Sequence, residues 1–226
     1  MSTPRTLLID ADDTLWENNI YYERVSTEFV AALGARGVAA ARAQETLWRT
    51  EQRNIQITGY GSQAFCQSLH EVARELGIAD LEPQIAGWED FIGLHPVELM
   101  PGVADTLPVL HARHRVIMVT KGQPTEQLAK LDRSGLAGYF HATEIMWEKT
   151  TAAYHSLIST HQLRPADTWM IGNSPRSDIN PAKAAGLGTV FIPYHTTWQH
   201  ELEEIASTGP ETLMLNSFAE LAAHFT

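Results

Sequence analysis

Five short apolar runs recur along the chain, and the stretches between them repeat apolar residues every three or four positions. The first pattern predicts strands and the second predicts helices. The strands are expected at roughly 6–10, 115–119, 142–146, 168–171 and 188–192. Strands that alternate with helices favour a doubly wound, parallel α/β sheet. The stretch from 199 to 226 predicts a helix, a short apolar run at 213–215 and a closing helix that starts near Ser217.

The segment from 17 to 96 interrupts this alternation. It shows no pattern of the strand type, but helical patterns at about 19–34, 39–53, 61–77 and 81–93. We therefore expect a Rossmann-like core of residues 1–16 and 97–226 with an inserted all-helical domain of residues 17–96. Because the insertion follows the first strand directly, we expect it to be hinged over the carboxyl edge of the sheet.

Carboxylates crowd the end of the first predicted strand, where Asp10, Asp12 and Asp13 follow the apolar run Leu7–Ile9. Ligands of open α/β sheets bind outside the carboxyl ends of the strands. Like charges that are held together repel unless a cation or a proton relieves them, so packing alone gives no reason for this grouping. A nucleophilic Asp beside a proton-donating Asp, over a divalent metal, would account for it.

Three later segments carry polar residues suited to phosphate or metal. The second strand ends in Thr120-Lys121-Gly122, Lys149 follows a further apolar run, and the fourth strand ends in Gly-Asn-Ser-Pro-Arg-Ser-Asp at 172–178. In this order, after Asp10 and Asp12, the series resembles the haloacid dehalogenase superfamily. It is similar to the phosphatase-like branch with a helical cap inserted after the first strand. The resemblance spans nearly the whole chain.

Phosphoryl transfer needs an in-line nucleophile, neutralisation of the phosphate charge and a proton for the leaving group. We expect Asp10 to be the nucleophile that forms an aspartyl-phosphate. Asp12 is expected to be the acid for the leaving oxygen and then the base for the attacking water. The metal would depress the pKa of Asp10, while Asp12 would be relatively free to take a proton. Lys149, where the family has its catalytic lysine, would keep Asp10 ionised and offset charge in the transition state.

Phosphate oxygens are expected to be held by Thr120, Lys121 and Gly122, through the hydroxyl and backbone N–H groups at a helix N-terminus. The side chain of Lys121 is a rival for the role of catalytic cation. The position of Lys149 relative to the last motif favours Lys149.

The expected cofactor is Mg²⁺, bound by Asp10, Asp12 through its backbone carbonyl, Asn173 and Asp178. The resembled family commonly has an acid where this chain has Asn173, so we expect weaker metal binding. The family's usual Gly after the second acid is Asp13 here. Asp13 either restores local negative charge or caps the following turn.

The amino-acid composition limits the classes of partner that the protein can bind. A formal net charge of −11 over 226 residues argues against a general binder of nucleic acid or of anionic membranes. No run approaches the length of a transmembrane helix, and the polar start is unlike a signal peptide. Cys66 is the only cysteine, so no internal disulfide is possible and a cytoplasmic location is expected. The expected partner is a small phosphorylated substrate, and the chain is expected to be a monomer or homodimer.

The favoured interpretation is a Mg²⁺-dependent phosphatase acting on a small phosphorylated metabolite. Within the superfamily the alternatives are a 2-haloacid dehalogenase, against which Asp12 argues because halide needs no proton, and a sugar-phosphate mutase. Asn173 leaves open a non-catalytic phosphate-binding protein. Substrate selectivity is expected in the helical insertion, where Arg49, Arg53 and Tyr60 are the candidates.

Overall fold

The computed structural model describes residues 4–196 and 198–225, and the chain divides into two compact units. The core unit holds the residues up to Asn19, the segment Val97–Lys121 and the residues from Gln127 onward. The helical unit holds Ile20–Pro96 together with the short segment Gly122–Glu126. Each unit has an apolar interior of its own.

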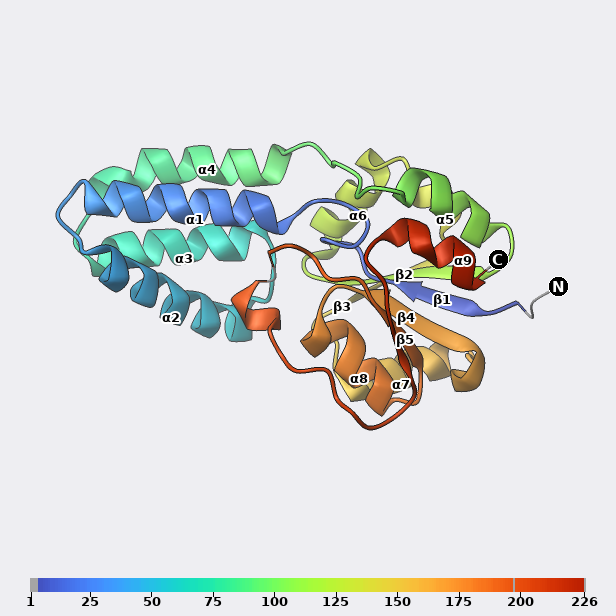
Figure 1. Ribbon diagram of the computed structural model, residues 1–226. Coiled ribbons are helices and arrows are strands. Elements are labelled where there is room, and N and C mark those ends of the chain that lie inside the picture. The colour runs from blue at the N-terminus through green and yellow to red at the C-terminus, as the bar shows by residue number, and fades with distance from the viewer. Residues whose placement is uncertain (1–3, 197, 226) are drawn as a thin grey trace. The chain divides into compact units, whose positions relative to one another are not determined.

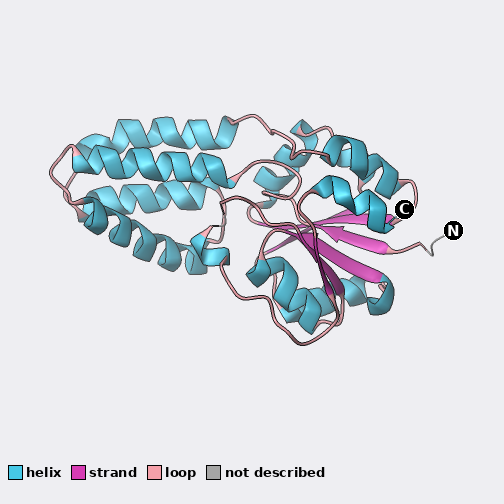
Figure 2. Ribbon diagram, viewed as in Figure 1, coloured by secondary structure: helices cyan, strands magenta, loops and turns pink. Residues whose placement is uncertain are grey.

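A six-stranded sheet forms the centre of the core unit (Figure 2). Its strands are β1 (Thr6–Ile9), β2 (Arg115–Lys121), β3 (Ala142–Met146), β4 (Thr168–Gly172), β5 (Gly188–Phe191) and β6 (Thr212–Met214). They lie in the order β3-β2-β1-β4-β5-β6, and neighbouring strands are parallel. The doubly wound α/β class is therefore confirmed. Because β1 pairs with β2 on one side and with β4 on the other, the topological switch point lies at the end of β1.

Successive residues of the central strands supply the two faces of this sheet. Leu7 and Ile9 of β1 share one apolar cluster with residues of α5, α6 and α9, whereas Leu8 shares another with residues of α7 and α8. These helices are α5 (Val103–His111), α6 (Pro124–Arg133), α7 (Thr151–Thr160), α8 (Asn180–Ala184) and α9 (Leu221–Phe225). Burial on both faces explains why Leu7–Ile9 of β1 is a continuous apolar run, and why the acids appear only after the strand ends.

The helical unit contains four helices that run alongside one another (Figure 1). They are α1 (Asn19–Gly34), α2 (Ala40–Thr58), α3 (Ser62–Glu75) and α4 (Glu82–Leu94). Phe29, Leu69 and Trp88 lie in their shared apolar interior. The second helix continues past the predicted end at 53 and stops before Gly59, whose φ of +78° suits glycine. Across residues 4–196 and 198–225, no helix has both the length and the apolar character to span a bilayer.

Glu126 explains why the segment Gly122–Glu126 packs with the helical unit. Its carboxylate accepts hydrogen bonds from the backbone N–H of Ser62 at 3.0 Å and from the Ser62 hydroxyl at 3.1 Å, where α3 begins. Gln123 donates to the carbonyl of Thr58, at the end of α2, at 3.2 Å. A carboxylate at a helix N-terminus satisfies an unpaired N–H and interacts favourably with the helix dipole. Sequence patterns did not indicate this cap.

The prediction of a helix at the start of residues 199–226 is wrong. Of the residues described there, Gln199–Glu201 form a single 3₁₀ turn, η5, and no helix follows until η6 (Phe218–Glu220) and α9. Asn180 donates to the carbonyl of Glu204 and accepts from the N–H of Ala206, each at 2.8 Å. Lys183 Nζ donates to the carbonyl of Ala206 at 2.8 Å. Side chains of α8 thus bind the backbone groups that a helix would have used.

Candidate active site

Asp10, Lys149 and Asp178 meet at the carboxyl edge of the sheet. Lys149 Nζ donates to Oδ1 of Asp10 at 2.5 Å and to Oδ1 of Asp178 at 2.7 Å. The side chains of Lys149 and Asp178 are almost fully buried, and Asp10 is about as deep. Asp10 comes directly after β1 and Asp178 lies in the short π-helical element η4 (Pro175–Ile179) that follows β4, so the parallel pairing of these strands brings them together.

Thr14 links this trio to Asn173. Its hydroxyl lies 3.0 Å from Oδ2 of Asp10 and 3.1 Å from Oδ1 of Asn173, and it donates to both as a shared hydrogen bond. Thr14 is not among the residues predicted for the site. The structure therefore brings together four residues predicted for the site, Asp10, Lys149, Asn173 and Asp178, and adds Thr14.

The glycine that ends β4 is required by the position of Asp178. A Cβ at Gly172 would lie 2.2 Å from Oδ2 of Asp178. That oxygen also accepts from the backbone N–H of Ser174 at 3.0 Å, which fixes the carboxylate against the strand end. Any larger residue at 172 would push Asp178 out of the site.

The charged groups of this cluster shift one another's pKa values. Burial and the charge of Asp178 raise the pKa of Asp10 and Lys149 opposes both, with the result that the pKa rises to about 7. For Lys149, burial favours the neutral amine, but the charges of Asp10 and Asp178 outweigh burial and raise its pKa above the usual value. A second cation beside the two carboxylates would relieve their remaining repulsion.

The Asp12 carboxylate accepts hydrogen bonds from three side chains, contrary to the expectation that it is relatively free to take a proton. It accepts from Trp16 Nε1 at 2.8 Å, from Gln127 Nε2 at 2.9 Å and from Lys130 Nζ at 3.1 Å. Burial alone would raise the pKa of Asp12, but the charge of Lys130 and these hydrogen bonds outweigh it, and the pKa is lowered. The geometry therefore describes the ionised form of Asp12. Gln127 and Lys130 were not singled out from the sequence, because nothing in α6 marks them as polar residues directed into a site.

Asp13 caps the start of α1. Its φ is +61°, in the left-handed region that glycine would occupy without strain. Its carboxylate accepts from the backbone N–H groups of Asn18 at 2.8 Å and of Asn19 at 2.9 Å. Of the two roles left open for Asp13, the structure shows the cap.

The residues predicted to bind phosphate stand at the end of β2. Thr120 is buried and Lys121 is the last residue of the strand. Gly122, with φ +123°, begins the segment assigned to the helical unit. The side chain of Lys121 is directed to acids, since its Nζ donates to Glu201 at 2.5 Å and lies 3.5 Å from Glu148. Glu201 was missed because it lies in the stretch predicted as a helix.

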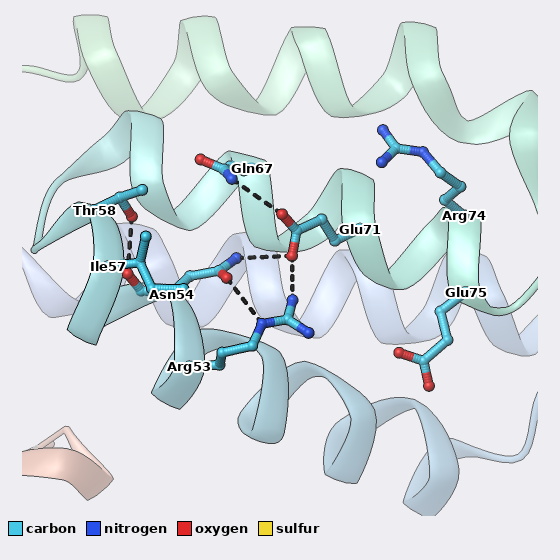
Figure 3. Close-up of a pocket in the computed structure, with 8 residues that line it drawn as sticks. All are labelled: Arg53, Asn54, Ile57, Thr58, Gln67, Glu71, Arg74 and Glu75. Carbon is cyan, nitrogen blue, oxygen red and sulfur yellow. Dashed lines mark hydrogen bonds and ion pairs between the residues drawn. The ribbon is translucent and has the colours of Figure 1, made fainter.

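Two of the predicted selectivity residues lie on a charged face of the helical unit. A groove of about 430 Å³ between α2 and α3 is lined by seven polar side chains, Arg53 among them, and by Ile57 (Figure 3). Arg53 pairs there with Glu71, and Arg49 pairs with Glu75. Tyr60 lies in the connection between α2 and α3. The positive charge of both arginines is thus balanced by glutamates of the same unit.

The oxygen donors of the site fit Mg²⁺. Among the described residues, no three His, Cys, Asp or Glu side chains are grouped to hold a metal. Asp10 and Asp178 supply two carboxylates, and Asn173 supplies an amide oxygen. Lys149 contacts both carboxylates, and Thr14 contacts Asp10 and Asn173. Mg²⁺ commonly takes one or two carboxylates and completes its shell with water and substrate oxygens.

The chain matches a known protein family and a characterised relative. A family model described as haloacid dehalogenase-like hydrolase matches residues 4–186. The pyrimidine 5'-nucleotidase YjjG from Escherichia coli K12 is 27% identical over an alignment of 125 residues, and the match covers 47% of this chain and 56% of that protein. The chain thus matches little more than half the length of that relative.

Two solved structures illustrate the likeness of fold. A haloacid dehalogenase-like family hydrolase from Xanthomonas campestris superimposes with a TM-score of 0.85 at 28% identity, covering 98% of this chain and 90% of that one. The L-2-haloacid dehalogenase from Xanthobacter autotrophicus superimposes with a TM-score of 0.66 at 15% identity, covering 98% of both chains. At that level of identity, the second match bears on the fold alone.

Proposed function

Because this chain belongs to the haloacid dehalogenase-like hydrolases, we propose that it is a Mg²⁺-dependent phosphatase that acts through an aspartyl-phosphate. The observation that carries the proposal is the buried cluster in which Lys149 bonds both Asp10 and Asp178. A cation held against a carboxylate nucleophile keeps it ionised and offsets the charge of an approaching phosphoryl group.

In the first step, an oxygen of Asp10 attacks phosphorus in line with the leaving oxygen, and the phosphoryl group passes to Asp10. Thr120 and the backbone N–H groups that follow it would hold the phosphoryl oxygens. Asp12 gives a proton to the leaving oxygen, which requires that it first take up a proton against the influence of Lys130. Leaving groups that depart as stable anions do not need this proton from Asp12.

In the second step, water attacks the aspartyl-phosphate, and Asp12 accepts the proton from that water. The ionised Asp12, held by Lys130, Gln127 and Trp16, is the form that this step needs. Inorganic phosphate then leaves and Asp10 is restored. The three hydrogen bonds orient the carboxylate before water arrives.

Asp10, Asn173, Asp178 and the backbone carbonyl of Asp12 would hold the Mg²⁺. When bound, the ion would neutralise phosphate charge at the site. One acid fewer than the common family pattern is consistent with modest affinity.

We propose that the helical unit acts as the cap that selects substrate. The relative named as a pyrimidine 5'-nucleotidase supports a small phosphorylated substrate and makes pyrimidine nucleoside monophosphates the first class to test. The match covers only part of each protein, so a panel of sugar phosphates and other phosphate monoesters belongs beside the nucleotides.

The second candidate is a 2-haloacid dehalogenase. The observation that favours it is the engaged Asp12 carboxylate, because displacement of halide by Asp10 needs no proton donor. A dehalogenase would also need no metal.

One assay separates the two activities. Turnover of p-nitrophenyl phosphate is measured with Mg²⁺ and with EDTA, beside halide release from 2-chloropropionate. We expect phosphate release that depends on Mg²⁺ and on Asp10, so Asp10→Asn should abolish it once deamidation is excluded by mass spectrometry. Asp105→Asn, which alters an exposed carboxylate of α5, is the matched control. Halide release that persists in EDTA, without phosphate release, would select the dehalogenase.

A further inference from the structure

A buried carboxylate outside the nucleophile cluster joins two of the loops that build the site. Glu201 lies in η5, between β5 and β6, and its side chain is largely buried. One carboxylate oxygen accepts from Lys121 Nζ at 2.5 Å. The other accepts from the hydroxyl of Ser177 at 2.5 Å and from the hydroxyl of Ser174. Glu201 therefore contacts the end of β2 and the loop after β4 at the same time.

The donors around Glu201 are bonded to one another as well. Lys121 Nζ also donates to the hydroxyl of Ser177 at 2.9 Å, which closes a ring of three residues. The Ser174 hydroxyl accepts from the backbone N–H of Ser177 at 2.9 Å. Next to this ring, Arg176 donates to the carbonyl of His200 at 2.9 Å. The turn η5 is thus attached to the loop after β4 at several points.

Such a carboxylate is stable only while it is paired, because an isolated charge in a protein interior is strongly unfavourable. Burial by itself would raise the pKa of Glu201, but the charge of Lys121 and the hydrogen bonds outweigh it and lower the pKa to about 2. Glu201 therefore stays ionised, and its ion pair with Lys121 is maintained at neutral pH.

Two of the residues held by this pairing adjoin the metal-site candidates. Ser174 follows Asn173, and Ser177 precedes Asp178. The backbone N–H of Asp178 donates to the carbonyl of Ser174 at 2.9 Å, so a backbone hydrogen bond links the first serine directly to Asp178. Fixing the serines therefore fixes the position of Asn173 and Asp178 relative to β2.

We propose that Lys121 and Glu201 form a brace that positions the loop Asn173–Asp178 against the end of β2. Lys121 acts through Glu201 and Ser177 rather than as a cation that binds phosphate. Both are positioning residues, and the catalytic consequence of the brace rests on the proposed phosphatase function.

Hydrogen–deuterium exchange tests the brace without any need for activity. In the metal-free protein, Glu201→Gln keeps the shape of the side chain but removes its charge, so exchange in residues 174–179 should accelerate about tenfold. Glu144→Gln, which alters a carboxylate that contacts His161 at the other edge of the sheet, should leave that exchange unchanged. Unchanged exchange in Glu201→Gln would overturn the proposal.

Kinetics test the same pairing through its effect on turnover. Glu201→Gln and Lys121→Met should each lower kcat for p-nitrophenyl phosphate about tenfold with KM changed less than about threefold. The double variant should be no slower than the slower single variant, because both changes remove one interaction. Losses that multiply, or a large rise in KM for Lys121→Met alone, would overturn the proposal and make Lys121 a phosphate ligand.

Two controls separate the possible failures. If Glu201→Gln does not fold, Ser177→Ala removes two hydrogen bonds of the ring while keeping both charges, and exchange in residues 174–179 should again accelerate. Unchanged exchange in that variant overturns the brace. If the wild type hydrolyses no phosphate monoester, the proposed function fails, whereas the exchange experiment still decides for or against the brace.

Discussion

Lys130 Nζ lies 3.1 Å and 3.3 Å from the two carboxylate oxygens of Asp12, although 118 residues separate the two in sequence. Lys130 is buried in α6 and also donates to Asn18 at 2.8 Å. The lysine therefore sets both the charge and the orientation of the acid that follows the proposed nucleophile by two residues. A surface lysine could not do this, because its charge would be screened by water.

The first prediction concerns this pair. Lys130→Met leaves the partly buried Asp12 without its cation, so the free energy of unfolding should fall by about 2 kcal/mol. Adding Asp12→Asn should recover roughly 1 kcal/mol, because a neutral amide no longer needs the lysine. Urea unfolding of the two single variants and the double variant measures the coupling. Lys183→Met is the control, since Lys183 donates to a backbone carbonyl and should show no coupling to Asp12→Asn. Strictly additive losses for Lys130 and Asp12 would contradict the pairing.

The second prediction separates the two steps of the proposed reaction. Asp12→Asn removes the base for the attacking water, so the aspartyl-phosphate should accumulate when the substrate is p-nitrophenyl phosphate. A burst of nitrophenol followed by a slow steady rate is expected, with the phosphoryl group found on Asp10 by mass spectrometry. Substrates with poor leaving groups should lose more rate, because they also need the acid. Equal losses for both substrate types, without a burst, would remove Asp12 from proton transfer.

The third prediction concerns the charge of the metal site. Asn173→Asp places a third carboxylate beside Asp10 and Asp178, where Thr14 has a single proton to share. In EDTA the melting temperature should fall by about 3–6 °C, because the added charge is unrelieved. Mg²⁺ should restore it and bind about tenfold more tightly than in the wild type. Thermal melts across a Mg²⁺ titration provide the measurement. A variant that is equally stable in EDTA would mean that residue 173 does not face the two acids.

The fourth prediction is a pH dependence in the helical unit. Desolvation of Glu51, on α2, raises its pKa to about 7. The folded chain therefore holds a proton that the unfolded chain loses between about pH 4.5 and pH 7, so this group lowers stability as pH rises through that window. Glu51→Gln should raise the free energy of unfolding at pH 8 by roughly 2 kcal/mol and leave it unchanged near pH 4.

Denaturant unfolding at both pH values checks the Glu51 prediction. Glu45→Gln, an exposed carboxylate of the same helix, is the matched control and should behave alike at the two pH values. If Glu51→Gln raises the free energy of unfolding equally at pH 4 and pH 8, the charge of Glu51 is not the cause of the increase.

The parts of the fold that follow from local pattern could be predicted. β1 is buried on both faces, so its apolar run and the acids at its end were visible in ten consecutive residues. Asp10, Lys149 and Asp178 could be placed together because parallel strands deliver their carboxyl ends to one edge. The contacts of Asp12 with Lys130, and of Lys121 with Glu201, could not be read from the sequence. Each joins side chains far apart in the chain, and neither the lysines nor the glutamate differ in type from solvated surface residues.

The failed helix after residue 199 has a related cause. Its sequence is compatible with a helix, but Asn180 and Lys183 bind the backbone of Glu204 and Ala206. Glu201 is meanwhile held by Lys121. Tertiary contacts of this kind override local propensity, which differs by only a few tenths of a kcal/mol between most residues.

The assignment of Gly122–Glu126 to the helical unit bears on how sequences of this type can be recombined. A chimaera that exchanged only Ile20–Pro96 would carry a foreign α3 whose first turn has to be capped by a resident Glu126, and a foreign Thr58 carbonyl facing a resident Gln123. The transplantable module is therefore two stretches of sequence rather than one. The shorter of them begins at Gly122, one of the residues predicted to bind phosphate, so exchanging specificity between relatives means editing part of the proposed phosphate site.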